Sequence, residues 1–153
     1  MTSRLKRLAR RDDGQALVEL SLTAGFLCLM LLAVWQVGTV FSNYIDISEA
    51  ARSGARAAAF SGAPTTTADA PSLAAAKSEG QFAATNSASV PGMVVTIVPV
   101  TPGGTLDPLG TTWTAGGKVR AIVTAPYSLT LFGVAISSGT LSVTDDMRVH
   151  RKG

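Results

Sequence analysis

The chain has 153 residues, of which 13 are basic, 10 are acidic, one is cysteine and one is histidine. Charged residues make up 15% of the chain, below the roughly 25% typical of soluble globular domains. A single cysteine excludes an intramolecular disulfide, and one cysteine with one histidine excludes a zinc site built from these two residue types. The length fits one small domain and does not fit a multidomain enzyme.

The net charge of +3 belongs to the first residues of the chain. Residues 1–14 carry five bases and two acids, whereas residues 15–153 carry eight of each. The body of the protein is therefore neutral, and we expect no nucleic-acid partner in spite of the high isoelectric point.

A long apolar stretch follows the basic residues. From Leu20 to Phe41 there are 22 residues without a formal charge. A helix of this length measures roughly 33 Å, which crosses a bilayer core of about 30 Å, whereas a signal peptide has a shorter apolar core. Bases precede this stretch, and none occurs in the ten residues after it. This asymmetry predicts a single-pass protein of the cytoplasmic (inner) membrane, with the N-terminus in the cytoplasm and the C-terminal domain outside.

The junction between the basic leader and the apolar stretch has a distinctive pattern. Gly14 ends the leader, and Glu19 is the fifth residue after it. A carboxylate at this place has two interpretations. It can lie at the inner headgroup level, in the first turn of the helix, where a negative charge suits the helix dipole. Alternatively, bases, a glycine, a carboxylate and continuous apolar residues together form a prepilin-type signal.

Two segments resemble one known family. The run Gly14-Gln15-Ala16-Leu17-Val18-Glu19-Leu20 resembles the processing site of the TadE-like pseudopilins of the tight-adherence (Flp) pilus machinery. The family usually has an aromatic residue where this chain has Leu20. About thirty residues later, the segment Ala50-Ala51-Arg52-Ser53-Gly54-Ala55-Arg56 resembles the Ala-Ala-Arg-x-Gly-Ala-Arg segment that follows the membrane helix in that family.

The resemblance implies a function and a set of partners. A prepilin peptidase would cut between Gly14 and Gln15, and Glu19 would serve processing or would pair with the amino terminus of a neighbouring subunit. The protein would be a minor pseudopilin or assembly component of a type IV pilus of the Flp class. Its partners would be the peptidase, other pilins and pseudopilins, pilus-assembly membrane proteins and the lipid bilayer. It would stay in the membrane or enter the pilus.

The helix is expected to continue beyond the membrane to Phe60. Ala is abundant there, proline is absent, and an apolar stripe recurs at helical spacing. Its members are Phe41, Tyr44, Ile47, Ala51, Ala55 and Ala58. Arg52 and Arg56 fall on the other side, either as solvated side chains or as a docking edge for another pilus component. We expect Gly54 to matter more than Ser53, because at a packing contact a larger side chain would force the backbones apart.

The rest of the chain predicts a small mixed domain. Residues 61–71 have the composition of a linker, and Ser72 is a plausible N-cap of a helix that ends near Ser87. Strands are predicted at 94–98, 118–125 and 141–149, with Trp113 closing a hairpin in the Gly-, Pro- and Thr-rich stretch 102–117. Residues 128–136 are largely apolar and carry no charge, and the pattern leaves open whether they form a buried strand or lie on the membrane.

These elements predict an α+β fold. A long N-terminal transmembrane helix would extend into a small extracytoplasmic domain with a short helix and an antiparallel sheet of three or four strands. The boundaries would be a leader at 1–14, the long helix at 15–60, the linker at 61–71 and the extracytoplasmic domain at 72–153.

Catalytic groupings are missing from the sequence of this domain. The one histidine, His150, lies near the C-terminus, and Asp145 and Asp146 form the one acidic pair. We therefore expect no enzyme, no cofactor, no metal and no small-molecule substrate. The alternative function is a membrane-tethered extracytoplasmic binding module unrelated to pili, with the sheet as its working part. A major pilin is disfavoured, because major Flp-type pilins are similar to the first helix alone.

Overall fold

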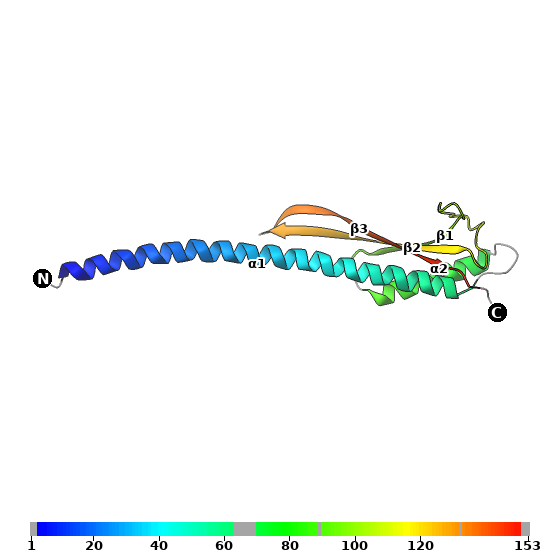
Figure 1. Ribbon diagram of the computed structural model, residues 1–153, viewed down its shortest axis with the longest axis horizontal. Helices are drawn as coiled ribbons and strands as arrows, with labels where there is room; N and C mark the ends of the chain where they lie inside the picture. The colour runs from blue at the N-terminus through cyan, green and yellow to red at the C-terminus, as the bar shows by residue number, and fades with distance from the viewer. Residues whose placement is uncertain (1–2, 63–69, 89, 132, 151–153) are drawn as a thin grey trace.

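The computed structural model describes residues 3–62, 70–88, 90–131 and 133–150. Within them it has two helices and three strands (Figure 1). The helices are α1 (Ser3–Phe60) and α2 (Ala70–Ser87), and the strands are β1 (Val94–Val100), β2 (Lys118–Leu131) and β3 (Val134–Arg148). The sheet is antiparallel in the order β1-β2-β3. The predicted α+β fold with a long helix, a short helix and a small antiparallel sheet is confirmed, with three strands.

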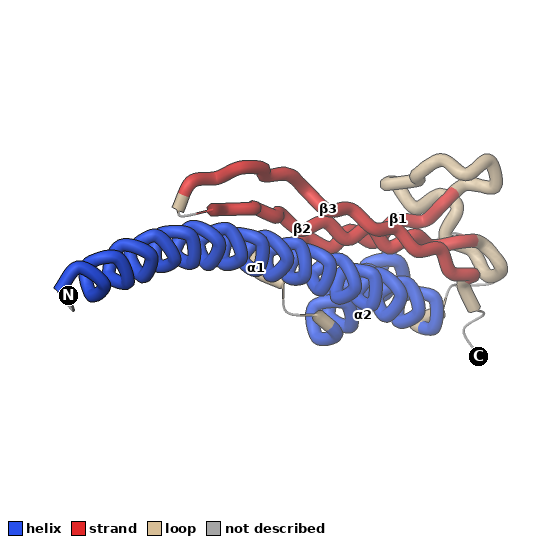
Figure 2. Tube along the Cα trace, turned by 60° about the vertical axis from the view of Figure 1, so that its left-hand side comes forward, coloured by secondary structure: helices blue, strands red, loops and turns tan. Residues whose placement is uncertain are grey.

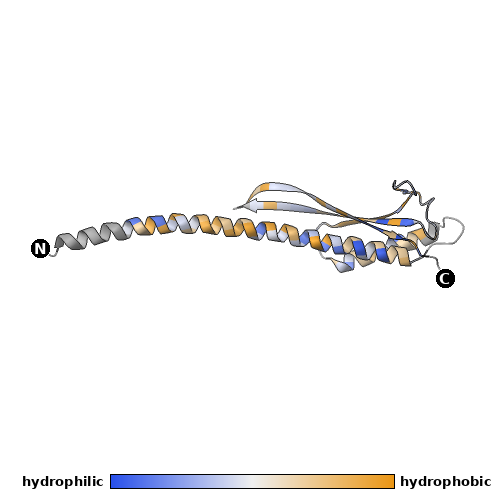
Figure 3. Cartoon of the chain, viewed as in Figure 1, coloured by the Kyte–Doolittle hydropathy of each residue, from blue (hydrophilic) through white to orange (hydrophobic). Residues whose placement is uncertain are grey.

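Helix α1 is a single rod of 58 residues. It contains no proline, so no residue interrupts its backbone hydrogen bonds. The described part of the leader continues in the same helix. In the described residues, one helical segment (Gly14–Phe60) is long and apolar enough to cross a membrane, and its most apolar window has a mean hydropathy of 2.2 with none of it buried. Figure 3 shows the apolar colouring along this part of the rod.

The head is the part of α1 from Ile47 onward together with α2 and the three strands. Both helices lie on one face of the sheet, so the head has two layers (Figure 2). Alternate residues of β2 point into the interface between the layers, and they are fully buried: Val119, Ala121, Val123 and Ala125. The predicted stripe on α1 is correct from Ile47 onward, whereas Phe41 and Tyr44 are 64% and 46% exposed.

Helix α2 begins at Ala70, two residues earlier than predicted. Pro71 therefore lies in the first turn, where its missing N–H removes no helical hydrogen bond. Ser72 lies inside the helix and is not its N-cap, which corrects that prediction. Residues 63–69 of the predicted linker lie outside the described residues.

The segment between β1 and β2 is a folded loop rather than a hairpin closed by Trp113. Its turns are held by backbone hydrogen bonds, and Val100 pairs with Leu106 in an isolated bridge. Trp113 is fully buried in the core with Ala55 and Ala58 of α1. The tryptophan thus covers the end of the helix pair, a core role that the sequence pattern did not indicate.

Strands β2 and β3 form a hairpin that is longer than the predicted strands. Strand β1 pairs with β2 only as far as Thr124, and β2 and β3 continue together beyond that point. The stretch 128–136, whose structure the sequence left open, supplies the ends of both strands. It is not a buried strand, because Val134 and Ile136 are 68% and 65% exposed. Figures 1 and 2 both show the closed end of the hairpin reaching past the head, alongside the apolar part of α1.

Candidate functional site

The segment from Gly14 to Glu19 lies on an open stretch of α1. Every residue in it is exposed, and a Cβ added to Gly14 would meet nothing within 4 Å. Gln15 and Glu19 are four residues apart, so they lie on the same side of the helix about one turn from each other. The peptide bond between Gly14 and Gln15 and the carboxylate of Glu19 are therefore both accessible to another protein.

Three hydroxyl groups in the apolar part of α1 are hydrogen-bonded within the helix. The hydroxyls of Ser21, Thr23 and Thr39 donate to the backbone carbonyls of Val18, Glu19 and Gln36 at 2.8, 2.9 and 2.8 Å, respectively. Such bonds remove the need for water, which a helix in hydrocarbon cannot reach. This stretch is therefore suited to a bilayer in spite of its hydroxyls.

The segment from Ala50 to Arg56 divides between the core and the surface. Ala51 and Ala55 are fully buried and Gly54 is buried with them, whereas Arg52 and Arg56 are exposed. The small residues face the sheet and α2, and the arginines face outward. In this segment the small residues therefore form the buried side of the helix, and the arginines form its open side.

Helices α1 and α2 approach each other closely at Gly54. A Cβ at Gly54 would lie 3.0 Å from the Gly80 carbonyl oxygen and 3.0 Å from the Ala84 Cβ. A Cβ at Gly80 would lie 2.8 Å from the Gly54 carbonyl oxygen. Next to this contact, the hydroxyls of Ser53 and Ser87 are 2.7 Å apart. The expectation that Gly54 lies at a packing contact is confirmed.

The open side of the same segment forms a shallow groove of about 420 Å³. Its lining residues all come from α1, and they are Glu49, Arg52, Ser53, Arg56, Ala57 and Phe60. Within the described residues, neither arginine is held by an ion pair. At the end of the groove the Phe60 ring stacks on the His150 ring with centroids 4.8 Å apart. His150 also donates its backbone N–H to the Ala59 carbonyl at 3.0 Å, so it ties the chain end to α1.

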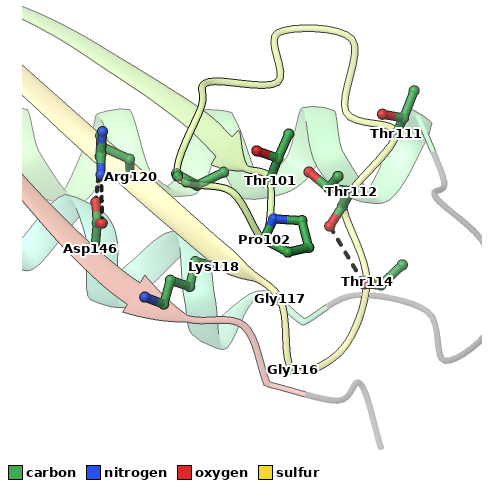
Figure 4. A pocket seen from close by; sticks show the side chains of 12 residues that line it. Thr101, Pro102, Thr111, Thr112, Thr114, Gly116, Gly117, Lys118, Arg120 and Asp146 are labelled. Atoms are coloured by element: carbon green, nitrogen blue, oxygen red, sulfur yellow. Dashed lines mark hydrogen bonds and ion pairs between the residues drawn. The ribbon is translucent and has the colours of Figure 1, made fainter.

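A second pocket, of about 490 Å³, lies on the outer face of the sheet beside the loop (Figure 4). Thr101, Thr112, Lys118 and the Arg120–Asp146 pair contribute to its lining. Arg120 donates two hydrogen bonds to Asp146, at 2.6 and 2.8 Å. These bonds lower the pKa of Asp146 against the effect of partial burial, and the charges of Arg120 and Lys118 lower it further. The same hydrogen bonds raise the pKa of Arg120.

The adjacent acids Asp145 and Asp146 point to opposite faces of the sheet. Asp145 is the cross-strand partner of the buried Ala121, and Asp146 is the partner of Arg120 on the outer face. Two carboxylates placed in this way cannot chelate one ion. In the part of the chain that the structure describes, no group of three or more His, Cys, Asp or Glu side chains is arranged to hold a metal.

Asp107 organises the loop between β1 and β2. Its carboxylate accepts hydrogen bonds from the Gly110 N–H at 3.1 Å, the Thr112 N–H at 2.6 Å and the hydroxyls of Thr111 and Thr112 at 2.8 and 2.9 Å. Burial raises the pKa of Asp107, but these hydrogen bonds lower it more, so its pKa lies below the ordinary value. The acid is therefore a structural group of the loop.

An apolar groove separates α1 from the hairpin. Its volume is about 420 Å³. Helix α1 contributes four residues and the hairpin three, namely Val37, Val40, Phe41 and Tyr44 with Tyr127, Leu129 and Leu141. This groove lies where the apolar stretch of α1 ends.

Within the described residues, the one long apolar helix and the α+β head are the features expected of a single-pass membrane protein. Residues 14–56 match the family described as TadE-like protein. The match begins at Gly14 and ends at Arg56, so it includes both resembling segments and confirms the resemblance. No curated protein and no solved structure matches the chain.

Several residues that organise the site were not identified from the sequence. Gly80 carried a usable signal, because a glycine inside an Ala-rich helix costs about 1 kcal/mol relative to alanine and so indicates a close approach. Asp107 and the Arg120–Asp146 pair carried none, since the bonds that each makes depend on the loop turns or on strand register.

Proposed function

We propose that the protein is a TadE-like minor pseudopilin or assembly component of a Flp-type pilus. The observation that carries the proposal is the family match over residues 14–56, which begins at the proposed cleavage site and ends in the α1–α2 contact. In this proposal α1 is the working part, and it acts by packing against the helices of other subunits. We assign the protein no catalytic role and no cofactor.

Cleavage between Gly14 and Gln15 requires the helix to open locally. A protease binds its substrate as extended backbone, and α1 is helical through this point. The sequence Asp12-Asp13-Gly14 is the weakest helix-forming run in this region, because aspartate and glycine both have low helix propensity. Gly14 also has no side chain to obstruct a cleft at the membrane surface. The motif therefore supports recognition by a prepilin peptidase.

Glu19 is proposed to act after the cut. Cleavage creates an α-amino group at Gln15, one turn from the Glu19 carboxylate. In a bundle of such helices, this carboxylate would pair with the amino terminus of a neighbouring subunit. Removing one member of a buried ion pair costs about 3–5 kcal/mol, because the other charge is left uncompensated. Such a cost would make assembly selective for processed subunits.

The surface of α1 is consistent with helix–helix assembly. Its apolar window is unburied within the chain. Small residues recur four apart, as in Ser21 with Gly25 and Gly38 with Ser42, and Cβ atoms added to the two glycines would meet nothing within 4 Å. Small residues at this spacing allow two helices to approach closely in lipid.

Two substitutions separate processing from assembly. Gly14→Arg should yield an uncut, membrane-inserted precursor, because a long charged side chain obstructs the cleft while the anchor is unchanged. Glu19→Ala should insert, be cut normally and fail to support pili, because the new amino group loses its partner. Intact-mass spectrometry of the membrane-extracted protein and a count of surface pili measure both steps.

The matched control is Glu79→Ala, which removes a carboxylate from an exposed position of α2 and should change neither readout. Loss of cleavage in Glu19→Ala would assign the carboxylate to peptidase recognition. A wild-type chain that retains residues 1–14 beside an active prepilin peptidase would contradict the pseudopilin proposal.

The second candidate is a membrane-tethered binding module, and the outer pocket of Figure 4 is the observation in its favour. Lys118 offers a positive charge, and the hydroxyl oxygens of the threonines can accept hydrogen bonds from a polar ligand. Lys118→Ala should leave piliation intact if the pseudopilin proposal is correct. If the variant instead forms normal pili but the cells lose their binding to a surface, the binding-module function would be favoured.

A further inference from the structure

The distribution of charged residues changes along the β2–β3 hairpin. Charged residues occur only at its open end, in the head, where Arg120 pairs with Asp146. From Ala121 to Thr144 there are 24 residues without a formal charge. This uncharged run is as long as the one in α1, yet it belongs to a hairpin. Strand β1 pairs with this hairpin only as far as Thr124.

The closed end of the hairpin exposes apolar side chains. Val134 and Ile136 are 68% and 65% exposed. The register shifts by one residue after Leu129, so Ile136 is the additional residue of a β-bulge. A bulge bends a strand and re-aims its side chains. The bulge therefore presents an isoleucine outward where a soluble strand end would be polar.

The closed end also lies level with the membrane segment of α1. Leu129 lines the apolar groove together with Val37 and Val40. Gly133 is four residues farther along the hairpin, about 13 Å at the strand rise. That distance corresponds to about nine residues of α1, from Val40 back toward Leu31. The closed end is therefore alongside the uncharged run that ends at Phe41, as Figures 1 and 2 show.

We infer that Ser128–Thr130 and Val134–Ser137 form a second membrane contact, which rests in the outer interface of the bilayer that α1 spans. The inference rests on the membrane topology predicted from the sequence and not on the pilus role. The partner is lipid, because the apolar surface lies at the height where α1 itself meets lipid. A water-facing surface of this kind would expose its apolar side chains without compensation.

The depth of this contact is limited by the backbone. Beyond Thr124 the outer edge of β2 has no strand partner in the described sheet, and unpaired backbone groups are not tolerated in the hydrocarbon core. The hydroxyls of Ser128, Thr130 and Ser137 also favour the headgroup region. The hairpin end therefore lies in the interface with Val134 and Ile136 toward the acyl chains, close to Tyr44 and Tyr127 at the height where aromatic residues are favoured.

The test uses an environment-sensitive fluorophore (NBD) on single cysteines of the full chain in phosphatidylcholine vesicles. Val134→Cys in a Cys28→Ala background reports on the hairpin. Leu109→Cys in the same background is the matched control, because Leu109 is an apolar loop residue that is 86% exposed. Label on the native Cys28 reports on the anchor. Quenching by nitroxide lipids and by aqueous iodide is measured at low and high lipid-to-protein ratios.

The expected result is a blue-shifted label at position 134, quenched by shallow nitroxide lipids and shielded from iodide at both ratios, with the label at 109 open to iodide. Iodide quenching at 134 equal to that at 109 would overturn the inference. Shielding that disappears at high lipid would also overturn it, because a second copy of the chain would then be the cover. A label on Cys28 outside the lipid would instead refute the membrane topology itself.

Discussion

Two glycines set the distance between the helices of the head. Each would bring a Cβ to 3.0 Å or less from the backbone carbonyl of the other, since the distances are 3.0 Å for Gly54 and 2.8 Å for Gly80. Glycine weakens a helix by about 1 kcal/mol at each position relative to alanine. Close packing of Ala58, Ala84 and Ile97 around the contact offsets that loss.

Gly54→Leu should therefore destabilise the head by about 1–3 kcal/mol or more, the usual effect of overpacking. Gly54→Ala should be close to neutral, because its gain in helix propensity is opposed by the two contacts at 3.0 Å. Urea unfolding followed by Trp113 fluorescence in a Trp35→Phe background measures both. Ala74→Leu, at an exposed position of α2, is the control. Equal midpoints for Gly54→Leu and Ala74→Leu would contradict this assignment.

Gly110 and Gly104 allow backbone strain to be separated from steric overlap. Both have a positive φ, 76° at Gly110 and 86° at Gly104. A Cβ at Gly110 would overlap the Leu73 side chain, whereas one at Gly104 would meet nothing within 4 Å. Gly104→Ala should cost about 1–3 kcal/mol from φ alone, and Gly110→Ala should cost more. The same unfolding assay compares them, and a larger loss at Gly104 would show that the loop relaxes around Leu73.

At the scale of elements, the loop between β1 and β2 depends on one carboxylate. Asp107 accepts hydrogen bonds from Gly110, Thr111 and Thr112, and these lower its pKa although burial raises it. The ordinary pKa of aspartate is about 3.9. As the pH falls through this value the unfolded chain binds a proton before the folded chain does, so folding stability declines. Its contribution is complete above the ordinary pKa and is lost as the pH falls through the lowered one.

Asp107→Asn should consequently weaken the loop at neutral pH and flatten the acid dependence of stability below about pH 4. The asparagine cannot accept the same set of bonds, because one of its side-chain groups is a donor. Melting temperature measured from pH 7 to pH 3 for both proteins tests this outcome. Parallel profiles would show that other carboxylates, such as Asp146, dominate the acid response.

Local pattern predicted the elements better than it predicted their extent. Alternation identified the paired part of β2 because Val119, Ala121 and Val123 face a helix layer. It missed the outer part, where one face of the hairpin is open and the other is only half-buried against α1. The position of Trp113 also depends on loop turns that bring it over α1, which no periodicity records. The pattern from Gly14 to Glu19 depends on no tertiary structure, since its residues lie within two turns of a single helix.

At the scale of the molecule, the basic leader and the head lie at opposite ends of α1 (Figure 1). A reporter enzyme fused after Gly153 should be active only outside the cytoplasmic membrane, because bases precede the apolar run and none follows it for ten residues. Replacing Arg4, Lys6, Arg7, Arg10 and Arg11 by glutamine should weaken this bias. Activity of the wild-type fusion confined to the cytoplasm would contradict the topology.

Because α1 is one unbroken helix, the rotational phase of the anchor and that of the head are locked together. Each residue of an α-helix turns the chain by about 100°. One residue inserted after Ile45 would swing Val37, Val40 and Phe41 away from Leu129 by that angle, whereas seven inserted residues would return them to within about 20° of their original direction. A neighbouring protein that binds one side of the anchor therefore determines the orientation of the head about the axis of α1. In an array of such subunits, every head would have the same orientation relative to its own anchor.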